Sequence, residues 1–141
     1  MFLVYVNYLA VLLCAVSSMI IGIVWYGPLF GKEWMKMVGM TKEKMEKAKE
    51  GMAQTYGIMF ISSLVMAYVL AHFIWYASPG TATVLIGVKT AIWAWLGFVA
   101  TVMFSKFLFS VDKKPMKLFF IDSAYYLVTL MVMGFIIAVL H

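Results

Sequence analysis

The chain has 141 residues, of which 65% are hydrophobic and only 12% are charged. Soluble domains are about half apolar and about a quarter charged, so this composition excludes an ordinary water-soluble globule, and the high hydrophobicity excludes a disordered chain. The single cysteine cannot form an internal disulfide bond. Eleven lysines without any arginine argue against a nucleic-acid partner, because base and phosphate recognition relies on bidentate arginine contacts. We therefore expect a single membrane domain over residues 1–141, with the lipid bilayer as its surroundings.

Four long apolar stretches alternate with short polar segments. A membrane-spanning helix needs about 20 apolar residues, and the stretches that satisfy this requirement are about 3–26, 53–76, 82–106 and 117–140. The first is not a cleaved signal, because it lacks a basic start and small residues at its end. Pro28 should end it, since proline fits poorly inside a helix. The pattern predicts an all-α integral membrane protein whose four transmembrane helices form two antiparallel hairpins.

Residues 32–50 differ sharply from the apolar stretches, because they contain six lysines and four glutamates. Within them Met45 and Ala48, followed by Met52, recur at helical spacing, and Thr41 is a suitable N-cap. We expect a short cytoplasmic amphipathic helix that runs into the second span. A solvated surface helix is the simplest interpretation, and a helix that senses lipid headgroups or docks a partner is the alternative.

The lysines also predict how the chain is oriented. Ten of the eleven lie in or beside the loops that follow the first and third spans, and Lys89 is the exception. Loops that face the cytoplasm carry the excess of positive charge in membrane proteins. We therefore expect loops 27–51 and 107–116 to be cytoplasmic and both termini to lie outside.

Small residues four positions apart mark two candidate packing faces. They are Ala10, Cys14, Ser18 and Gly22 in the first span, and Gly97, Thr101 and Ser105 in the third. Helices associate in lipid through close backbone approach, so both faces should be buried inside the bundle or in a subunit interface. Aromatic residues that suit the headgroup level lie at Trp25, Tyr26, Trp34, Trp75 and Tyr76.

Charged and polar side chains inside the spans are costly and therefore informative. Lys106 and Asp122 lie at similar depth on adjacent spans, so we expect a structural ion pair, and the alternative makes Asp122 a proton or cation site. Lys89 should extend its charge to the interface. Asn7 and His72 lie toward the outer side and, together with Lys89, could line a polar pocket there.

The sequence contains no phosphate-binding loop, zinc motif or nucleophile elbow. We therefore expect neither an enzyme nor a bound cofactor or metal ion. Two functions remain open. The first is a small-solute or ion transporter or permeation protein, which would act as a homo-oligomer because four short spans enclose little space. The second is a non-catalytic membrane scaffold that binds a partner.

The two halves of the chain share few residues. Gly22-Ile23-Val24 matches Gly97-Phe98-Val99, and Ala67-Tyr68 matches Ala124-Tyr125. Both halves would have the same orientation, as in parallel repeats. The matches are too few to predict an internal duplication.

Five segments spread over nearly the whole chain carry a family resemblance. They are Asn7 to Val11, Trp25 to Met35 (WYGPLFGKEWM), Met66 to Phe73, Trp93 to Thr101, and Tyr125 to Val128. In this order they resemble a family of small bacterial and archaeal membrane proteins, the domain-of-unknown-function family 1761. The resemblance implies a compact four-span protein in the inner membrane of a prokaryote and implies no activity.

Overall fold

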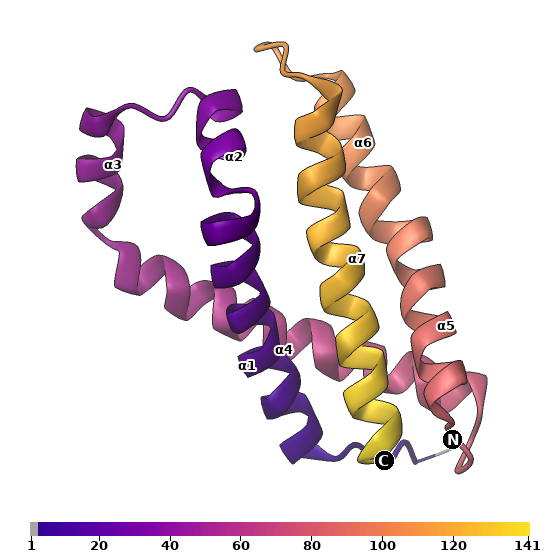
Figure 1. Cartoon of the computed structure of the whole chain (residues 1–141). Coiled ribbons are helices and arrows are strands. Elements are labelled where there is room, and N and C mark those ends of the chain that lie inside the picture. Colours follow the sequence, from indigo (N-terminus) through magenta and orange to yellow (C-terminus); the bar gives the residue numbers. More distant parts are fainter. Residues whose placement is uncertain (1–2) are drawn as a thin grey trace.

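The computed structural model describes residues 3–141 as an assembly of helices, and no strand occurs in that range (Figure 1). Four helical segments are long and apolar enough to cross a membrane. They are α1 (Tyr8–Val24) with the π-helical turn η1 (Trp25–Leu29); α4 (Met52–Ala77); α5 (Val84–Ala94) with the π-helical turn η2 (Trp95–Ala100) and α6 (Thr101–Leu108); and α7 (Met116–Val139). The predicted all-α integral membrane fold is confirmed.

The first span begins later than the apolar sequence does. The helix begins at Tyr8 rather than at Leu3, because Asn7 has extended backbone and caps the first turn. Its side-chain oxygen accepts hydrogen bonds from the backbone N–H groups of Leu9 at 3.0 Å and Ala10 at 3.3 Å. The cap satisfies donors that have no partner within the helix, so it fixes the start of the span.

The first span ends at Leu29, one residue beyond the end predicted at Pro28. Pro28 lies inside η1, where the Phe30 N–H donates to the carbonyl of Trp25 at 2.9 Å. This wider π-type hydrogen bond spans the proline, which has no N–H of its own to donate. The chain therefore continues in nearly the same direction as α2 (Gly31–Val38) (Figure 1).

The charged segment after α2 forms a separate helix, α3 (Lys42–Lys49). Thr41 caps it as predicted, because its hydroxyl oxygen accepts from the Lys44 N–H at 3.2 Å. The expected continuation into the second span is wrong, since Gly51 has a φ of 75° and breaks the helix between α3 and α4. Every residue from 41 to 59 is exposed, so α3 and the first turns of α4 stand away from the other helices.

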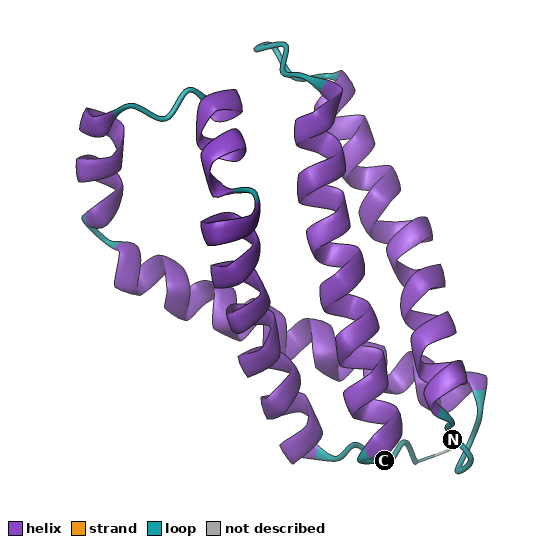
Figure 2. Cartoon of the chain, in the orientation of Figure 1, coloured by secondary structure: helices purple, strands orange, loops and turns teal. Residues whose placement is uncertain are grey.

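The long helices meet at α7. In Figure 1, α1, α7 and the α5–α6 segment run lengthwise side by side, and α4 crosses behind them obliquely. In α7, 44% of the apolar stretch is buried, against 17–28% in the other three spans. Figure 2 shows the connecting loops gathered at the two ends of these helices. α7 is therefore the most buried span, and α1 and α4 also pack against each other.

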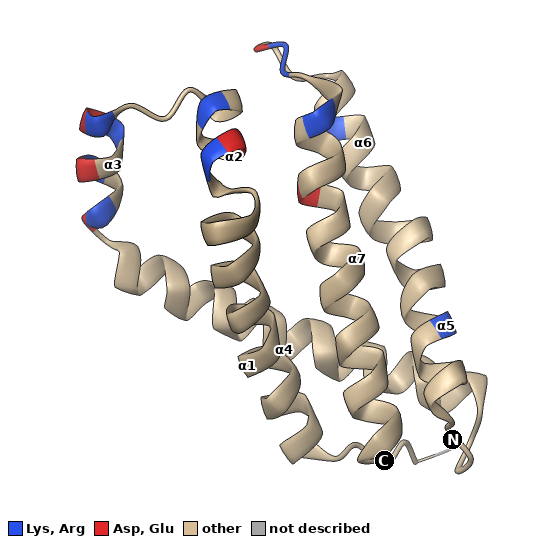
Figure 3. Cartoon of the chain, viewed as in Figure 1, with Lys and Arg blue, Asp and Glu red and all other residues tan. Residues whose placement is uncertain are grey.

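Charged residues collect at one end of the molecule (Figure 3). This end, which we call the lysine-rich end, comprises α2, α3, the first turn of α7 and the connection between α6 and α7. An ion pair between Glu33 of α2 and Lys117 of α7 joins two of these elements. The opposite end holds the turn between α4 and α5, the start of α1 and the C-terminus (Figure 1).

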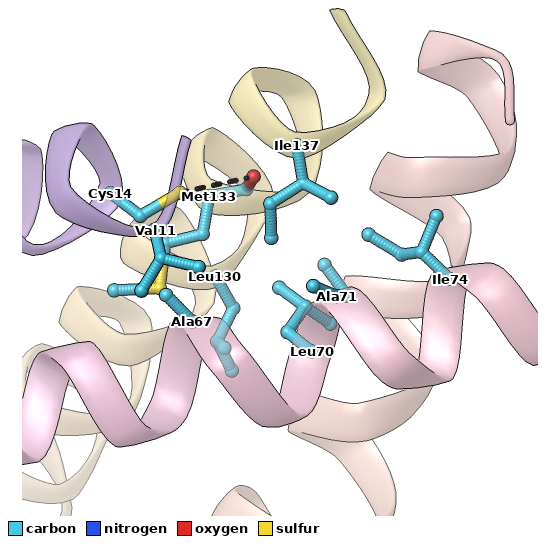
Figure 4. Packing of buried hydrophobic residues seen from close by; sticks show 10 residues of the cluster. Val11, Cys14, Ala67, Leu70, Ala71, Ile74, Leu130, Met133 and Ile137 are labelled. Atoms are coloured by element: carbon cyan, nitrogen blue, oxygen red, sulfur yellow. Dashed lines mark hydrogen bonds between the residues drawn. The ribbon is translucent and has the colours of Figure 1, made fainter. Parts of the chain in front are cut away.

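The core lies between α1, α4 and α7 (Figure 4). Its buried members include Val11, Cys14, Ala67, Leu70, Ile74, Leu130, Met133 and Ile137. Inside it the Cys14 thiol donates to the Met133 carbonyl oxygen at 3.6 Å. The core also includes Ala91 of α5, beside which the tightest contact of α7 lies.

Backbones touch where α5 crosses α7. A Cβ atom added to Gly87 would collide with the backbone of Gly134, and one added to Gly134 would collide with the backbone of Gly87. Ala91 and Ala138, each four residues further along, are also buried. The crossing thus uses a glycine and an alanine at a spacing of four on both helices, the pattern that lets transmembrane backbones approach closely.

Candidate functional site

Asp122 is the only acidic residue inside the four spans. It lies in the second turn of α7, is partly buried, and accepts a hydrogen bond from the Tyr26 hydroxyl at 2.7 Å. A short bond from a neutral hydroxyl to a carboxylate is charge-assisted, so it holds the side chain toward η1. The bond connects the first and fourth spans near the lysine-rich end.

Aromatic rings surround this carboxylate. The ring centroids of Tyr26 and Trp34 are 5.4 Å apart in an edge-on arrangement, and those of Tyr26 and Tyr125 are 5.3 Å apart. Tyr126 packs against Tyr125 at 5.0 Å, and the Trp34 side chain also approaches Asp122. We call these five residues the Asp122 cluster. Its contents are one carboxylate, three phenols and one indole, which can bind a cation through charge and through ring faces.

The predicted pairing of Asp122 with Lys106 is wrong. Among residues 3–141 the three ion pairs involve neither residue. Lys106 is exposed on α6, whereas Asp122 turns toward Tyr26 of the first span. The two residues are close in depth along their helices but not in direction around α7, which the sequence alone does not reveal. The cost of burying the carboxylate is offset by a hydroxyl rather than by a positive charge.

Further hydroxyls continue from the cluster into the middle of the bundle. Tyr125 donates its hydroxyl to the backbone carbonyl of Ser18 at 3.2 Å, and the Ser18 and Ser63 hydroxyls share a hydrogen bond of 2.9 Å. Ser18, Ser63 and Tyr125 are all buried and come from α1, α4 and α7. Buried polar groups of this kind are expected to be hydrogen-bonded, and these are.

One buried hydroxyl on the same face of α7 has no partner. Thr129 is 1% exposed, and its hydroxyl oxygen makes no hydrogen bond within residues 3–141. It lies one helical turn from Tyr125, which contacts Ser18, and one turn from Met133, whose carbonyl contacts Cys14. The polar seam, as we call it, therefore comprises Asp122, Tyr26, Tyr125, Ser18, Ser63 and Thr129, and runs from the lysine-rich end to the middle of the spans.

Two tryptophan side chains, one in the first span and one in the third, form hydrogen bonds to α7. The Trp25 indole N–H donates to the Ile121 carbonyl at 3.1 Å, and the Trp95 indole N–H donates to the Ser123 carbonyl at 2.8 Å. Each tryptophan is the first residue of a π-helical turn. Such turns often occur at functional positions because they displace side chains from the regular helical register. Here they place one indole on either side of the α7 segment that carries Asp122.

The predicted packing face of the first span is buried. Ala10, Cys14 and Ser18 are at most 3% exposed, and Gly22 faces the Tyr125 ring, whose hydroxyl would lie 3.4 Å from an added Cβ atom. This face meets α4 and α7 rather than lipid. The small residues thus let α1 approach α4 and α7 closely enough for the groups of the polar seam to form hydrogen bonds.

The predicted packing face of the third span is wrong. Gly97, Thr101 and Ser105 are exposed, and an added Cβ atom on Gly97 would meet nothing within 4 Å. The two hydroxyls bond to carbonyls of their own helix, Thr101 to Gly97 at 2.8 Å and Ser105 to Thr101 at 3.0 Å. The close contact of this span is made instead at its other end, by Gly87 and Ala91.

The residues expected to form a pocket at the opposite end are engaged separately. Asn7 caps α1 and donates its amide to the Leu140 carbonyl, whereas His72 bonds to the Tyr68 carbonyl of its own helix at 2.9 Å. Lys89 is exposed on α5. Each of the three thus has its own surroundings, and the residues do not form one hydrogen-bonded group.

The interfacial aromatic residues divide into two sets. Trp25, Tyr26 and Trp34 belong to the contacts with α7 described above. Tyr76 is 63% exposed at the end of α4, beside the half-buried Trp75. Within residues 3–141, no group of three or more His, Cys, Asp or Glu side chains is arranged to hold a metal ion.

Four contacts that matter at this site were not apparent from sequence. The crossing of Gly87 with Gly134 carried a usable signal, because each glycine is followed by an alanine four residues later. The indole bonds of Trp25 and Trp95 to carbonyls of α7 carried none. The bond from Tyr26 to Asp122 was hidden because tyrosine near the end of a span is usually assigned to the headgroup level.

Comparison with known proteins gives one match. A family model described as "Protein of unknown function (DUF1761)" matches residues 9–138. The search of curated proteins and the search of solved structures gave no match. The match covers all four spans, the Asp122 cluster and the whole polar seam.

Proposed function

Since the chain belongs to the DUF1761 family, whose description assigns no activity, we propose from the geometry of the site that it is an oligomeric transporter or permeation protein for protons or small cations. Asp122 is the binding carboxylate in this proposal. The observation that carries it is a partly buried acid whose hydrogen-bond partner is the neutral Tyr26. Ionisable residues within transmembrane segments commonly mark ion or proton pathways.

The surroundings of Asp122 suit a positively charged ligand. Tyr26 occupies one carboxylate oxygen, and the rings of Trp34, Tyr125 and Tyr126 lie around it. A carboxylate among aromatic faces attracts a cation by its charge and by the negative ring faces, and both effects strengthen where water is excluded. A proton is the smallest such ligand and is bound directly by the carboxylate.

The polar seam provides further polar groups between Asp122 and the middle of the spans. The Ser18 and Ser63 hydroxyls, which share a hydrogen bond, can both donate and accept, whereas Tyr125 donates its hydroxyl to the Ser18 backbone carbonyl, which only accepts. The Thr129 hydroxyl, which has no hydrogen-bond partner within residues 3–141, adds a further donor and acceptor one turn beyond Tyr125.

Assembly of several copies is part of the proposal. Four short spans enclose little space, and the first turns of α4, including Ile58 and Ile61, have apolar side chains that are more than half exposed. A mass of at least two chains, measured by light scattering on the detergent-solubilised protein, is expected. A monomer at all concentrations would contradict oligomeric action.

The test is ion flux in reconstituted vesicles. Purified protein in liposomes that contain a pH-sensitive dye should dissipate a proton gradient faster than empty liposomes. Asp122→Asn should reduce this flux to the level of empty liposomes, since the substitution removes the charge but preserves the shape. Asp112→Asn is the matched control, because Asp112 is an exposed loop residue. Equal flux from the Asp122→Asn protein and the wild type would overturn the proposal.

We propose that the lysine-rich end faces the cytoplasm and that both termini lie outside, in the inner membrane of a prokaryote. The support is the distribution of the lysines, of which ten of eleven lie in or beside the connections at that end. Ser78→Cys and Lys44→Cys should then react with an impermeant thiol reagent from opposite sides. The native Cys14 is completely buried and should give little background. Reaction of both variants from the same side would contradict the orientation.

A second function, partner binding without transport, is favoured by α3. All its residues are exposed, and its lysines and glutamates alternate along a helix that stands away from the bundle. Folded wild-type protein that conducts neither protons nor Na⁺ nor K⁺ in liposomes would favour this second function over the first.

A further inference from the structure

An apolar groove lies on the side of the molecule where α4 crosses the third span. It has a volume of about 350 Å³ and is lined by Met66, Val69 and Phe73 of α4, by Phe98 and Val99 of η2, and by Leu130 of α7. The volume is within the range of small-ligand sites, about 300–1,000 Å³. The groove exists because α4 is oblique and diverges from the third span toward the lysine-rich end (Figure 1).

A second hollow extends this groove toward the lysine-rich end. It has a volume of about 380 Å³, and it shares Phe98 and Val99 with the first. Its remaining lining residues include Met103, Lys106 and Tyr126. The two hollows therefore form one elongated groove that is apolar over most of its length and ends at an ammonium group and a phenol.

The charge at the end of the groove is not neutralised by the protein. Lys106 takes part in none of the three ion pairs found among residues 3–141. The nearest acid in the spans is Asp122, one turn before Tyr126, and its carboxylate bonds to Tyr26 on the α1 side. A ligand in the groove therefore meets a free positive charge.

We infer that this groove binds one anionic phospholipid of the surrounding membrane. An acyl chain lies along Phe98 and Val99, and the phosphate binds Lys106 and accepts a hydrogen bond from Tyr126. The inference does not require the proposed function, because it rests on Lys106 and on the apolar lining of the groove, and it shares only Tyr126 with the Asp122 cluster.

Charge complementarity selects this occupant over a second copy of the chain. A second copy would have to bring an acid to Lys106 within the membrane, and its only acid in the spans, Asp122, is held by Tyr26. A phospholipid carries an apolar chain and an anionic group in one molecule. Basic residues near the membrane surface attract such headgroups.

The experiment is native mass spectrometry of the purified protein with an equimolar mixture of dioleoyl phosphatidylglycerol and dioleoyl phosphatidylcholine. One bound phosphatidylglycerol per chain is expected, with a preference of about fivefold over phosphatidylcholine. Lys106→Gln should abolish the preference. Lys89→Gln, the same change in the same span but away from the groove, should leave it intact.

Two further measurements separate the other occupants. Val99→Trp fills the groove and should lower retention of both lipids, whereas millimolar inorganic phosphate should not displace the bound lipid. Displacement by phosphate would show an anion site without a lipid site and would overturn the inference. An equal lipid preference in the Lys106→Gln and Lys89→Gln proteins, or a lipid-free dimer as the only species, would overturn it as well.

Discussion

The first and third spans make the same kind of hydrogen bond to α7, but the residues that follow this bond make different contacts. Each contains a Trp-x-Gly sequence within a π-helical turn, and the indoles of Trp25 and Trp95 donate to carbonyls two residues apart on α7. The next residue is Tyr26 in the first span, which bonds to Asp122, and Leu96 in the third, which is 47% exposed. After these turns the third span also packs against α7, where the rings of Phe104 and Phe107 meet Phe119, but it borders a groove that ends at Lys106.

The difference shows what holds helices together in lipid. Apolar side chains gain little by leaving lipid for another helix, so close packing of small residues and interhelical hydrogen bonds are decisive. The first span combines small residues with hydroxyl bonds along much of its length. The third span has its close backbone contact near Gly87, and beyond Trp95 it meets α7 through aromatic rings and, among residues 3–141, without a hydrogen bond. The part of the third span beyond Trp95 is therefore available to line a ligand site.

The largest expected effect breaks the close contact of the third span. Gly134→Leu places a side chain against the backbone of Gly87, so neither helix can keep its position. We expect a loss of more than about 3 kcal/mol in the free energy of unfolding, or no folded protein. Thermal unfolding in detergent measures the loss. Gly97→Leu is the matched control and should be nearly neutral, because an added Cβ there meets nothing. Similar losses of stability in the Gly134→Leu and Gly97→Leu proteins would contradict the close contact between Gly134 and Gly87.

A smaller effect is expected where the two spans differ, at Tyr26. Tyr26→Phe removes a hydrogen bond to a carboxylate and should cost about 1–2 kcal/mol of unfolding free energy. Tyr8→Phe serves as control, since Tyr8 is 72% exposed and makes no side-chain hydrogen bond within residues 3–141. Chemical or thermal unfolding in the same detergent would compare them, and equal stability of both variants would speak against the bond.

The feature common to both spans gives a third prediction. Trp25→Phe and Trp95→Phe each remove one indole bond to a carbonyl of α7. Each should cost about 0.5 kcal/mol, because interhelical hydrogen bonds in membranes are individually weak. Similar losses in unfolding experiments support equivalent roles. A large loss for one and none for the other would show that the two tryptophans are not equivalent.

The smallest effect concerns the ion pair between Glu33 and Lys117. Both side chains are more than half exposed, so the pair is screened by water and salt. Glu33→Gln should change the unfolding free energy by about 0.3 kcal/mol or less, and the change should vanish at high salt. A large, salt-independent loss would mean that α2 is held to α7 mainly by this pair.

Sequence reasoning recovered the features that depend on composition. The four spans, the Thr41 cap and the burial of Ala10, Cys14 and Ser18 follow from local pattern and agree with the structure. The sequence-based predictions failed where the contact depends on the direction in which a side chain points from its helix. Lys106 and Asp122 have matching depth but different directions, and small residues such as Gly97 satisfy the spacing rule without facing a neighbour.

The bond between Tyr26 and Asp122 is the central claim, and a double-mutant cycle tests it most directly. The unfolding free energies of Tyr26→Phe, Asp122→Asn and the double variant should give a coupling energy of about 1 kcal/mol. The parallel cycle with Lys106→Gln and Asp122→Asn should give a coupling energy of zero within error. A larger coupling in the Lys106 cycle than in the Tyr26 cycle would contradict the account.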